Sequence, residues 1–225
     1  MRGKIFRIIS KSIKEIFFIV IGIIIAFQLE DVNNRRLQRI REKEILAEIK
    51  RNLLNDLNEI ELNRKLLLKI QKSNFMIINY LGGKQNNITS ISASLNNVGS
   101  GVFFITEKMG YDELQSEGIG IVSNRVLGKE IINIYEAKYD YLRKVENEID
   151  LNFRMSILLP ILNKCRKHLS SEGFCHFNEN MSLEAKNELI ESLLFDKKNK
   201  NTQLKIYSEL SSKIIYICSI LRNEL

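Results

Sequence analysis

The stretch Ile16-Phe17-Phe18-Ile19-Val20-Ile21-Gly22-Ile23-Ile24-Ile25-Ala26-Phe27 decides the architecture of this chain, because it is the only long apolar run without a charge. Extended through Gln28 to Leu29, it spans roughly 21 Å as a helix, at about 1.5 Å per residue. The hydrocarbon layer of a bilayer is roughly 30 Å thick, so the run alone is short for a membrane-spanning helix.

Residues before the run lengthen it. Lys11 and Lys14 have long side chains whose amines reach the headgroups, so Ile8, Ile9 and Ile13 add to the apolar length. We therefore predict a basic leader followed by a single transmembrane anchor, whose partner is the lipid bilayer.

Three other interpretations compete with the anchor. A cleaved signal peptide would have the same basic start, but residues 26–30 offer no small-x-small cleavage site. A buried core helix fits the length alone, although the basic leader is not typical of one. An in-plane interfacial helix would need a polar face, which residues 16–27 lack.

The charge distribution argues against nucleic-acid binding. The net charge is +7, but the leader contributes +5 of it and leaves +2 for the remainder. The five basic residues of the leader are Arg2, Lys4, Arg7, Lys11 and Lys14. Basic residues also follow the run, but Glu30 and Asp31 come first. We expect the N-terminus inside the cytoplasmic (inner) membrane and the C-terminal domain in the periplasm.

The rest of the composition predicts an all-α fold: the N-terminal transmembrane helix continues into a long stalk helix that packs against several later helices. We divide the chain into a leader and anchor at 1–29 and a helical domain at 30–225. That domain has a long helix at 30–81, a loop at 82–110, and helices up to 222. The stalk carries an apolar stripe with steps of mostly three and four: Leu46, Ile49, Leu53, Leu57, Ile60, Leu67 and Ile70. Either the chain's own later helices or a parallel homo-oligomeric coiled coil could cover it.

The remaining segments are predicted from local signals. We expect at most one helical turn at 91–95 within the loop, and an apolar patch at 102–105 that docks on the stalk. Gly118 ends a short helix, and Asn124 caps the next one. A further helix at 148–169 should kink or break at Pro160.

The last part is predicted as two helices. Ser182 caps a helix to about residue 195, residues 197–201 form a solvated turn, and a helix at 202–222 follows. The apolar residues 214–221 are too few for a second span and belong to the core. Glu146 and Asp150, four residues apart, are assigned to a solvated helix face.

Most of the sequence resembles a known family, and the resemblance is most specific over the predicted anchor. Glu15-Ile16, Val20-Ile21-Gly22-Ile23, Ala26-Phe27-Gln28-Leu29 and Asn33-Asn34, with a later pattern around Tyr111 to Gly118, resemble a domain-of-unknown-function family. Its members are short single-span bacterial membrane proteins, frequent in Bacteroidota. Val32 departs from the tryptophan usual in that family, which removes an interfacial aromatic anchor. The resemblance implies a membrane location and a helical fold, and no reaction, cofactor or catalytic residue.

One cluster could carry chemistry: Cys165, His168, Cys175 and His176. These residue types can bind zinc, although the spacing is not that of a standard finger. In an oxidising compartment a Cys165–Cys175 disulfide is an alternative, and so are ordinary partly buried side chains. No familiar catalytic motif is present, and Gly118-x-Gly120 lacks the context of a phosphate loop.

These observations favour a non-enzymatic interaction or scaffold module at the bacterial membrane, without a cofactor, that binds a protein partner or forms a homo-oligomer and does not bind nucleic acid. The alternatives are a membrane-acting effector or accessory factor, and a metal-dependent enzyme that uses the four-residue cluster.

Overall fold

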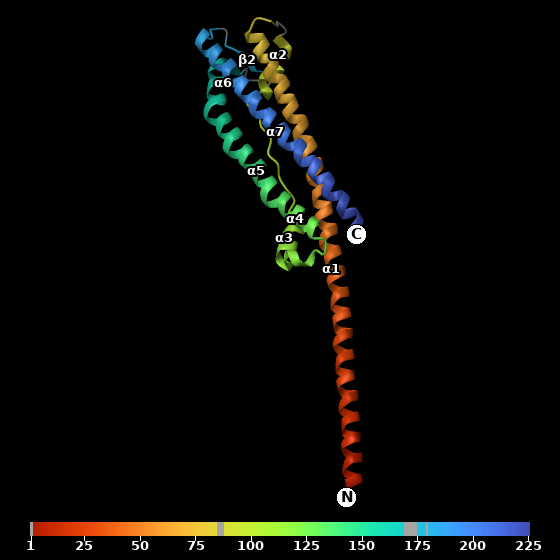
Figure 1. Ribbon diagram of the computed structural model, residues 1–225. Helices are drawn as coiled ribbons and strands as arrows, with labels where there is room; N and C mark the ends of the chain where they lie inside the picture. Colours follow the sequence, from red (N-terminus) through yellow and green to blue (C-terminus); the bar gives the residue numbers. More distant parts are fainter. Residues whose placement is uncertain (1, 85–87, 169–174, 179) are drawn as a thin grey trace.

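A computed structural model shows a long single helix that leads into a helical bundle at its far end (Figure 1). The structure describes residues 2–84, 88–168, 175–178 and 180–225, with side chains from residue 17 onward except those of 88–90 and 168. Helices make up almost all of it, which confirms the predicted all-α class. Two three-residue strands, β1 (Arg166–His168) and β2 (Cys175–Phe177), form an antiparallel pair that we had not predicted.

The first helix, α1 (Arg2–Leu81), runs for 80 residues without a break. The predicted continuation of the anchor helix into the stalk is therefore confirmed. Its apolar stripe is buried, with only Leu57 partly exposed. The later helices of the same chain cover this stripe, so it is not available for a coiled coil between copies.

The second long element of the bundle is a nearly continuous helix made of alternating α and π segments. They are α4 (Arg125–Ile132), η2 (Asn133–Lys138), α5 (Tyr139–Lys144), η3 (Val145–Leu151), η4 (Arg154–Leu158) and α6 (Leu159–Cys165). The predicted cap is confirmed, since the Asn124 side chain accepts hydrogen bonds from two backbone N–H groups of α4 at 3.1 Å. Pro160 lies in the first turn of α6, directly after a π segment, and the helix ends four residues earlier than predicted.

The π segments explain which residues this element buries. Every fourth residue is buried: Leu142, Glu146, Asp150, Arg154, Leu158 and Leu162. In an α-helix of 3.6 residues per turn, a repeat of four drifts steadily around the helix. A π turn closes from residue i to i+5 and takes more residues, so it cancels the drift and keeps this row on the inner side.

The third long element is α7 (Leu183–Glu224), one helix of 42 residues that packs against α1 (Figure 1). Our prediction of a solvated turn at 197–201 is wrong, because the helix continues through it and Lys200 is fully buried. Ser182 caps the helix as predicted, accepting a 3.1 Å hydrogen bond from the backbone N–H of Ala185. Of residues 214–221, predicted to belong to the core, Ile214, Ile217 and Leu221 are unexposed, whereas Ile215 and Tyr216 are 58% and 47% exposed.

Shorter elements connect the three long ones. Helix α2 (Ile88–Asn97) is longer than the single turn we expected. Residues 101–108 form neither a helix nor a strand and run back along α1 to α3 (Met109–Glu117) and η1 (Ile119–Ile121) (Figure 1). The predicted docking of residues 102–105 is confirmed, because Val102 and Phe104 are buried in the core cluster that contains the stalk stripe.

Candidate functional site

The segment predicted as the anchor stands alone in the structure. From Phe17 onward its large apolar side chains are exposed, apart from the half-buried Ile21, and α1 contains the one candidate membrane span among the described residues. The most apolar 18-residue window of this helix has a mean hydropathy of 1.5, and none of it is buried inside the protein. The backbone of the whole run belongs to α1. The side chain of Ile16, its first residue, lies outside the described part.

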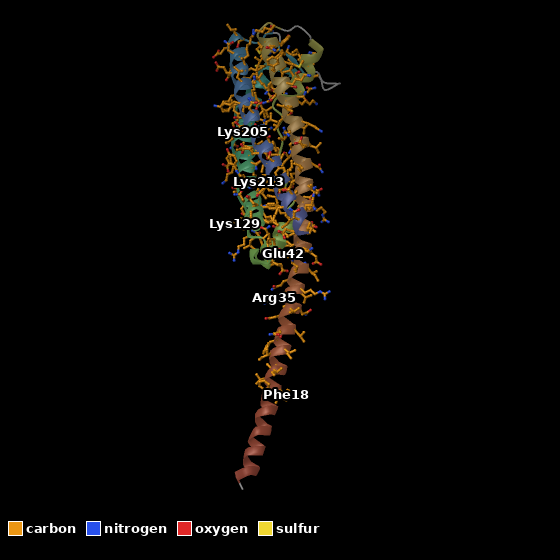
Figure 2. All side chains as sticks on the ribbon, turned by 45° about the vertical axis from the view of Figure 1, so that its right-hand side comes forward. Phe18, Arg35, Glu42, Lys129, Lys205 and Lys213 are labelled. Atoms are coloured by element: carbon orange, nitrogen blue, oxygen red, sulfur yellow. The ribbon has the colours of Figure 1, made fainter. Side chains whose placement is uncertain are left out.

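An exposed neck, residues 30–41 of α1, separates this segment from the bundle, and Arg39 and Arg41 at its end form ion pairs with Glu224 and Glu113 of the bundle. Every residue from 22 to 40 is exposed, and Glu42 is the first buried side chain. In Figure 2, Phe18 and Arg35 lie on the single helix, whereas Glu42 lies where the bundle begins. Residues 30–41 amount to roughly 18 Å of helix at about 1.5 Å per residue. The neck therefore sets the distance between the apolar segment and the bundle.

Hydrogen bonds fasten the end of the bundle to the neck. The carboxylate of Glu42 accepts from the Ser123 backbone N–H at 2.8 Å and from its hydroxyl at 2.6 Å, and Arg39 donates to it at 2.7 Å. Partial burial alone would raise the pKa of Glu42, but these three donors outweigh it and lower the pKa below its usual range. Glu42 is thus a charged clamp between α1 and the loop before α4.

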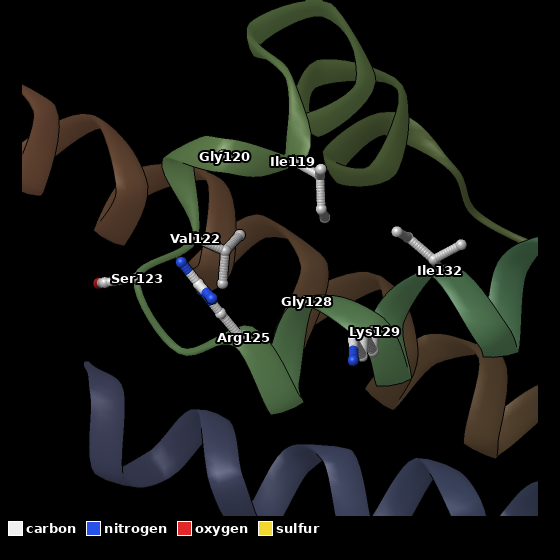
Figure 3. A pocket seen from close by; sticks show the side chains of 8 residues that line it. All are labelled: Ile119, Gly120, Val122, Ser123, Arg125, Gly128, Lys129 and Ile132. Carbon is white, nitrogen blue, oxygen red and sulfur yellow. The ribbon is translucent and has the colours of Figure 1, made fainter.

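A pocket lies next to this clamp, between η1 and α4 (Figure 3). Its volume is about 490 Å³, and Ile119, Val122, Gly128 and Ile132 give it an apolar lining. Arg125 and Lys129 stand at its edge, and neither forms an ion pair with the described part of the chain. A second hollow of about 420 Å³ shares Ile119 and Ile132 and has Glu136 in its lining.

The bundle interior holds a set of polar and charged residues that we call the polar spine. Each is less than a tenth exposed, and together they come from all three long helices: Asp56, Asn63, Asn74, Tyr139, Glu146, Asp150, Arg154, Asp196, Lys200, Gln203 and Tyr207.

The centre of the polar spine is a buried ion-pair network. Lys200 Nζ donates to Asp150 Oδ1 at 2.5 Å, and Arg154 Nε donates to Asp150 Oδ2 at 2.9 Å. Lys200 also lies 3.7 Å from Asp196, whose other oxygen accepts from Asn74 at 2.7 Å. Desolvation raises the pKa of Asp196 despite these neighbours. The network joins α1, η3, η4 and α7 in one register.

Two further layers of the polar spine use tyrosine hydroxyls. Tyr207 donates a short hydrogen bond to Glu146, whose other oxygen accepts from the backbone N–H of Phe104 at 3.0 Å. Tyr139 donates to Asp56 at 2.7 Å. Burial raises the pKa of Glu146, and it raises that of Asp56 to about 6. These groups are sealed from solvent, and their hydrogen bonds join α1 and α7 to the second long element of the bundle.

The Cys/His cluster is only partly brought together. Cys165 ends α6, and its buried free thiol donates to the backbone oxygen of Ala185 at 3.7 Å, so it is not bridged to Cys175. Cys175 pairs with His168 in the strand ladder, and the ring of His176 contacts Ser92 at 3.2 Å. The side chain of His168 lies outside the described part. Within that part, no group of three or more histidine, cysteine or acidic residues could hold a metal ion.

Our sequence reasoning missed most of the polar spine. It assigned Glu146 and Asp150 to a solvated face, which is wrong, since their exposures are 2% and 0%. One available signal was the four-residue repeat that places both in line with Leu142 and Leu158.

No family model, curated protein or solved structure matches this chain.

Proposed function

We propose that this chain is a single-pass protein of the bacterial cytoplasmic membrane that holds a helical bundle at a fixed distance from the bilayer as a non-enzymatic interaction module. The observation that carries the proposal is the continuity of α1, which joins an exposed apolar segment to the bundle core through the exposed neck. Exposed apolar side chains in water are unfavourable at this density, and a bilayer removes that cost.

The basic leader before the apolar segment and the acidic pair after it favour a cytoplasmic N-terminus and a periplasmic bundle. The resemblance to the single-span family of unknown function supports the same location. The polar spine is sealed inside the bundle and links its helices to one another, which supports a role for the bundle as a rigid binding module.

Membrane extraction tests the tether. The full chain should sediment with membranes and stay there at alkaline pH, and a variant lacking residues 1–29 should become soluble. Release of the full chain by alkali would contradict the tether. The interaction role fails if the purified chain remains monomeric in mild detergent and captures no partner by cross-linking in intact membranes.

A further inference from the structure

The pocket between η1 and α4 has an aliphatic interior. Its volume of about 490 Å³ is within the range of roughly 300–1,000 Å³ that is usual for small-molecule sites. In Figure 3, Ile119 and Ile132 point toward each other across this space. None of the described lining residues is aromatic, and the hydroxyl of Ser123 is already bonded to Glu42 and Arg39. The interior therefore favours an alkyl chain over a sugar, a nucleotide or an aromatic ring.

Gly128 keeps one wall of this pocket open. It lies in the interior of α4, where glycine is less favourable than alanine because its backbone loses more freedom on folding. A Cβ at this position would lie 3.5 Å from the Ile119 side chain and 3.7 Å from that of Val122, which are ordinary contacts. Packing therefore does not require glycine here, and what the missing side chain provides is room between these two residues.

Two unpaired cations stand on the same side of the pocket. Arg125 and Lys129 are four residues apart on α4 and both are exposed, and neither has an ion-pair or hydrogen-bond partner in the part of the chain that the structure describes. Both side chains extend from α4 beside the pocket (Figure 3). Like charges at this spacing on a helix repel each other. An anion held between them removes the repulsion and accepts charge-assisted hydrogen bonds.

The carboxylates closest to these cations in the fold are engaged elsewhere. None of the described lining residues is acidic. Four acidic residues flank the elements that form the pocket, and each has a partner within the chain: Glu42 and Glu224 pair with Arg39, Glu130 pairs with Lys213, and Glu136 accepts from Tyr111. The pocket thus combines an aliphatic interior with a cationic edge whose charge is not balanced by its described neighbours.

We propose that this pocket binds a single-chain anionic amphiphile, with the alkyl chain against Ile119, Gly128 and Ile132 and the anionic head between Arg125 and Lys129. Fatty acids and lysophospholipids share this chemistry. The site belongs entirely to the bundle, so the proposal does not depend on the membrane tether. It goes beyond the proposed interaction module by giving the bundle a small-molecule ligand.

Photolabelling tests the site. The full chain in phosphatidylcholine nanodiscs is irradiated with dodecanoate that carries a diazirine at the far end of its chain, and mass spectrometry of proteolytic fragments locates the label. The same chain ending in an alcohol is the neutral control. The anionic probe should label residues 119–132 at least about fivefold more than the alcohol, because only the anion gains the two charged contacts. A lysophosphatidic acid with the same diazirine chain distinguishes a phosphate head from a carboxylate, and preferential labelling by either anion supports the proposal.

Two variants separate the shape of the pocket from its charge. Gly128→Leu fills the open wall and should lower labelling by the anion and by the alcohol, whereas the double variant Arg125→Gln/Lys129→Gln should lower labelling by the anion alone. Lys205→Gln, at an exposed position of α7, is the matched control and should be labelled like the native chain.

The double variant changes only exposed side chains, so it tests the site even where the unfolding midpoint shows that Gly128→Leu fails to fold. Equal labelling of the native chain by the anions and the alcohol would overturn the proposal. So would labelling by the anions that the double variant leaves unchanged.

Discussion

Lys200 Nζ lies 2.5 Å from Asp150 Oδ1, and both side chains are sealed from solvent in the centre of the bundle. The pair joins α7 to η3, and Arg154 closes the same carboxylate from the other side. Taking such charges out of water is costly, and the mutual attraction repays the cost only while the network is complete. The helices of the bundle are therefore held in one register as long as every member is present.

Replacing Lys200 by methionine should destabilise the bundle by about 3–5 kcal/mol, because it leaves Asp150 and Asp196 without their shared cation. The matched control is Lys205→Met, an exposed position on the same helix labelled in Figure 2, which should change stability by less than about 0.5 kcal/mol. Thermal unfolding of the full chain in mild detergent, followed by circular dichroism, measures both. Similar midpoints for the two variants would show that the buried network contributes little.

Asp56 should make stability depend on pH. Desolvation raises its pKa from 3.8 to about 6 in the folded chain, so the stability it contributes is fully present below 3.8 and is lost as the pH rises through 6. Between about pH 4 and pH 8 the native chain should lose on the order of 2–3 kcal/mol relative to Asp56→Asn.

Denaturation midpoints of the native chain and Asp56→Asn across that pH range give the difference directly. Asparagine keeps an oxygen to accept from the Glu107 backbone N–H, which in the native chain is 3.0 Å from Asp56 Oδ1. Parallel pH profiles for the two proteins would contradict the raised pKa.

Gly101 should tolerate no side chain. A Cβ there would overlap the guanidinium of Arg154, which cannot move aside because it is bonded to Asp150 at 2.9 Å and to the Gly99 oxygen at 3.2 Å. Gly101→Ala should therefore cost about 1–3 kcal/mol. Gly120→Ala is the control, since nothing lies within 4 Å of that position. The same unfolding assay separates the two, and an unchanged midpoint for Gly101→Ala would mean that Arg154 is not held in place.

The thiol of Cys165 should be slow to alkylate. Desolvation raises its pKa, and its side chain is fully buried, so little reactive thiolate forms and little reagent reaches it. Mass spectrometry after brief iodoacetamide treatment should find Cys165 unmodified in the native chain and modified after unfolding. Rapid native labelling would show that this end of the bundle opens readily.

The sequence was sufficient to predict the parts of the fold that depend on local apolar spacing. The stripe from Leu46 to Ile70 has ordinary helical spacing, and Asn124 and Ser182 precede helical runs, so each was recognisable without tertiary information. The apolar segment before residue 30 was also recognisable from the sequence alone.

The polar spine was not predicted because its signals are tertiary. Lys200 lies in the run Lys197-Lys198-Asn199-Lys200-Asn201, whose composition is typical of a solvated turn. The carboxylate of Asp150, fifty residues earlier in the chain, and that of Asp196 make burial of that amine tolerable. The buried row from Leu142 to Leu162 could not be predicted either. Its repeat of four residues stays on the inner face only when π turns are present, and the sequence alone did not indicate these turns.

We propose above that α1 crosses a membrane and carries the bundle on the far side. The most direct test fuses a reporter to either end of the full chain. One reporter is alkaline phosphatase, which is active only in the periplasm. The other is green fluorescent protein, which is fluorescent only in the cytoplasm when export takes place in unfolded form. A cytoplasmic N-terminus and a periplasmic bundle should give phosphatase activity from the C-terminal fusion and fluorescence from the N-terminal fusion. Fluorescence from both ends would place both termini in the cytoplasm and would contradict a single membrane-spanning helix.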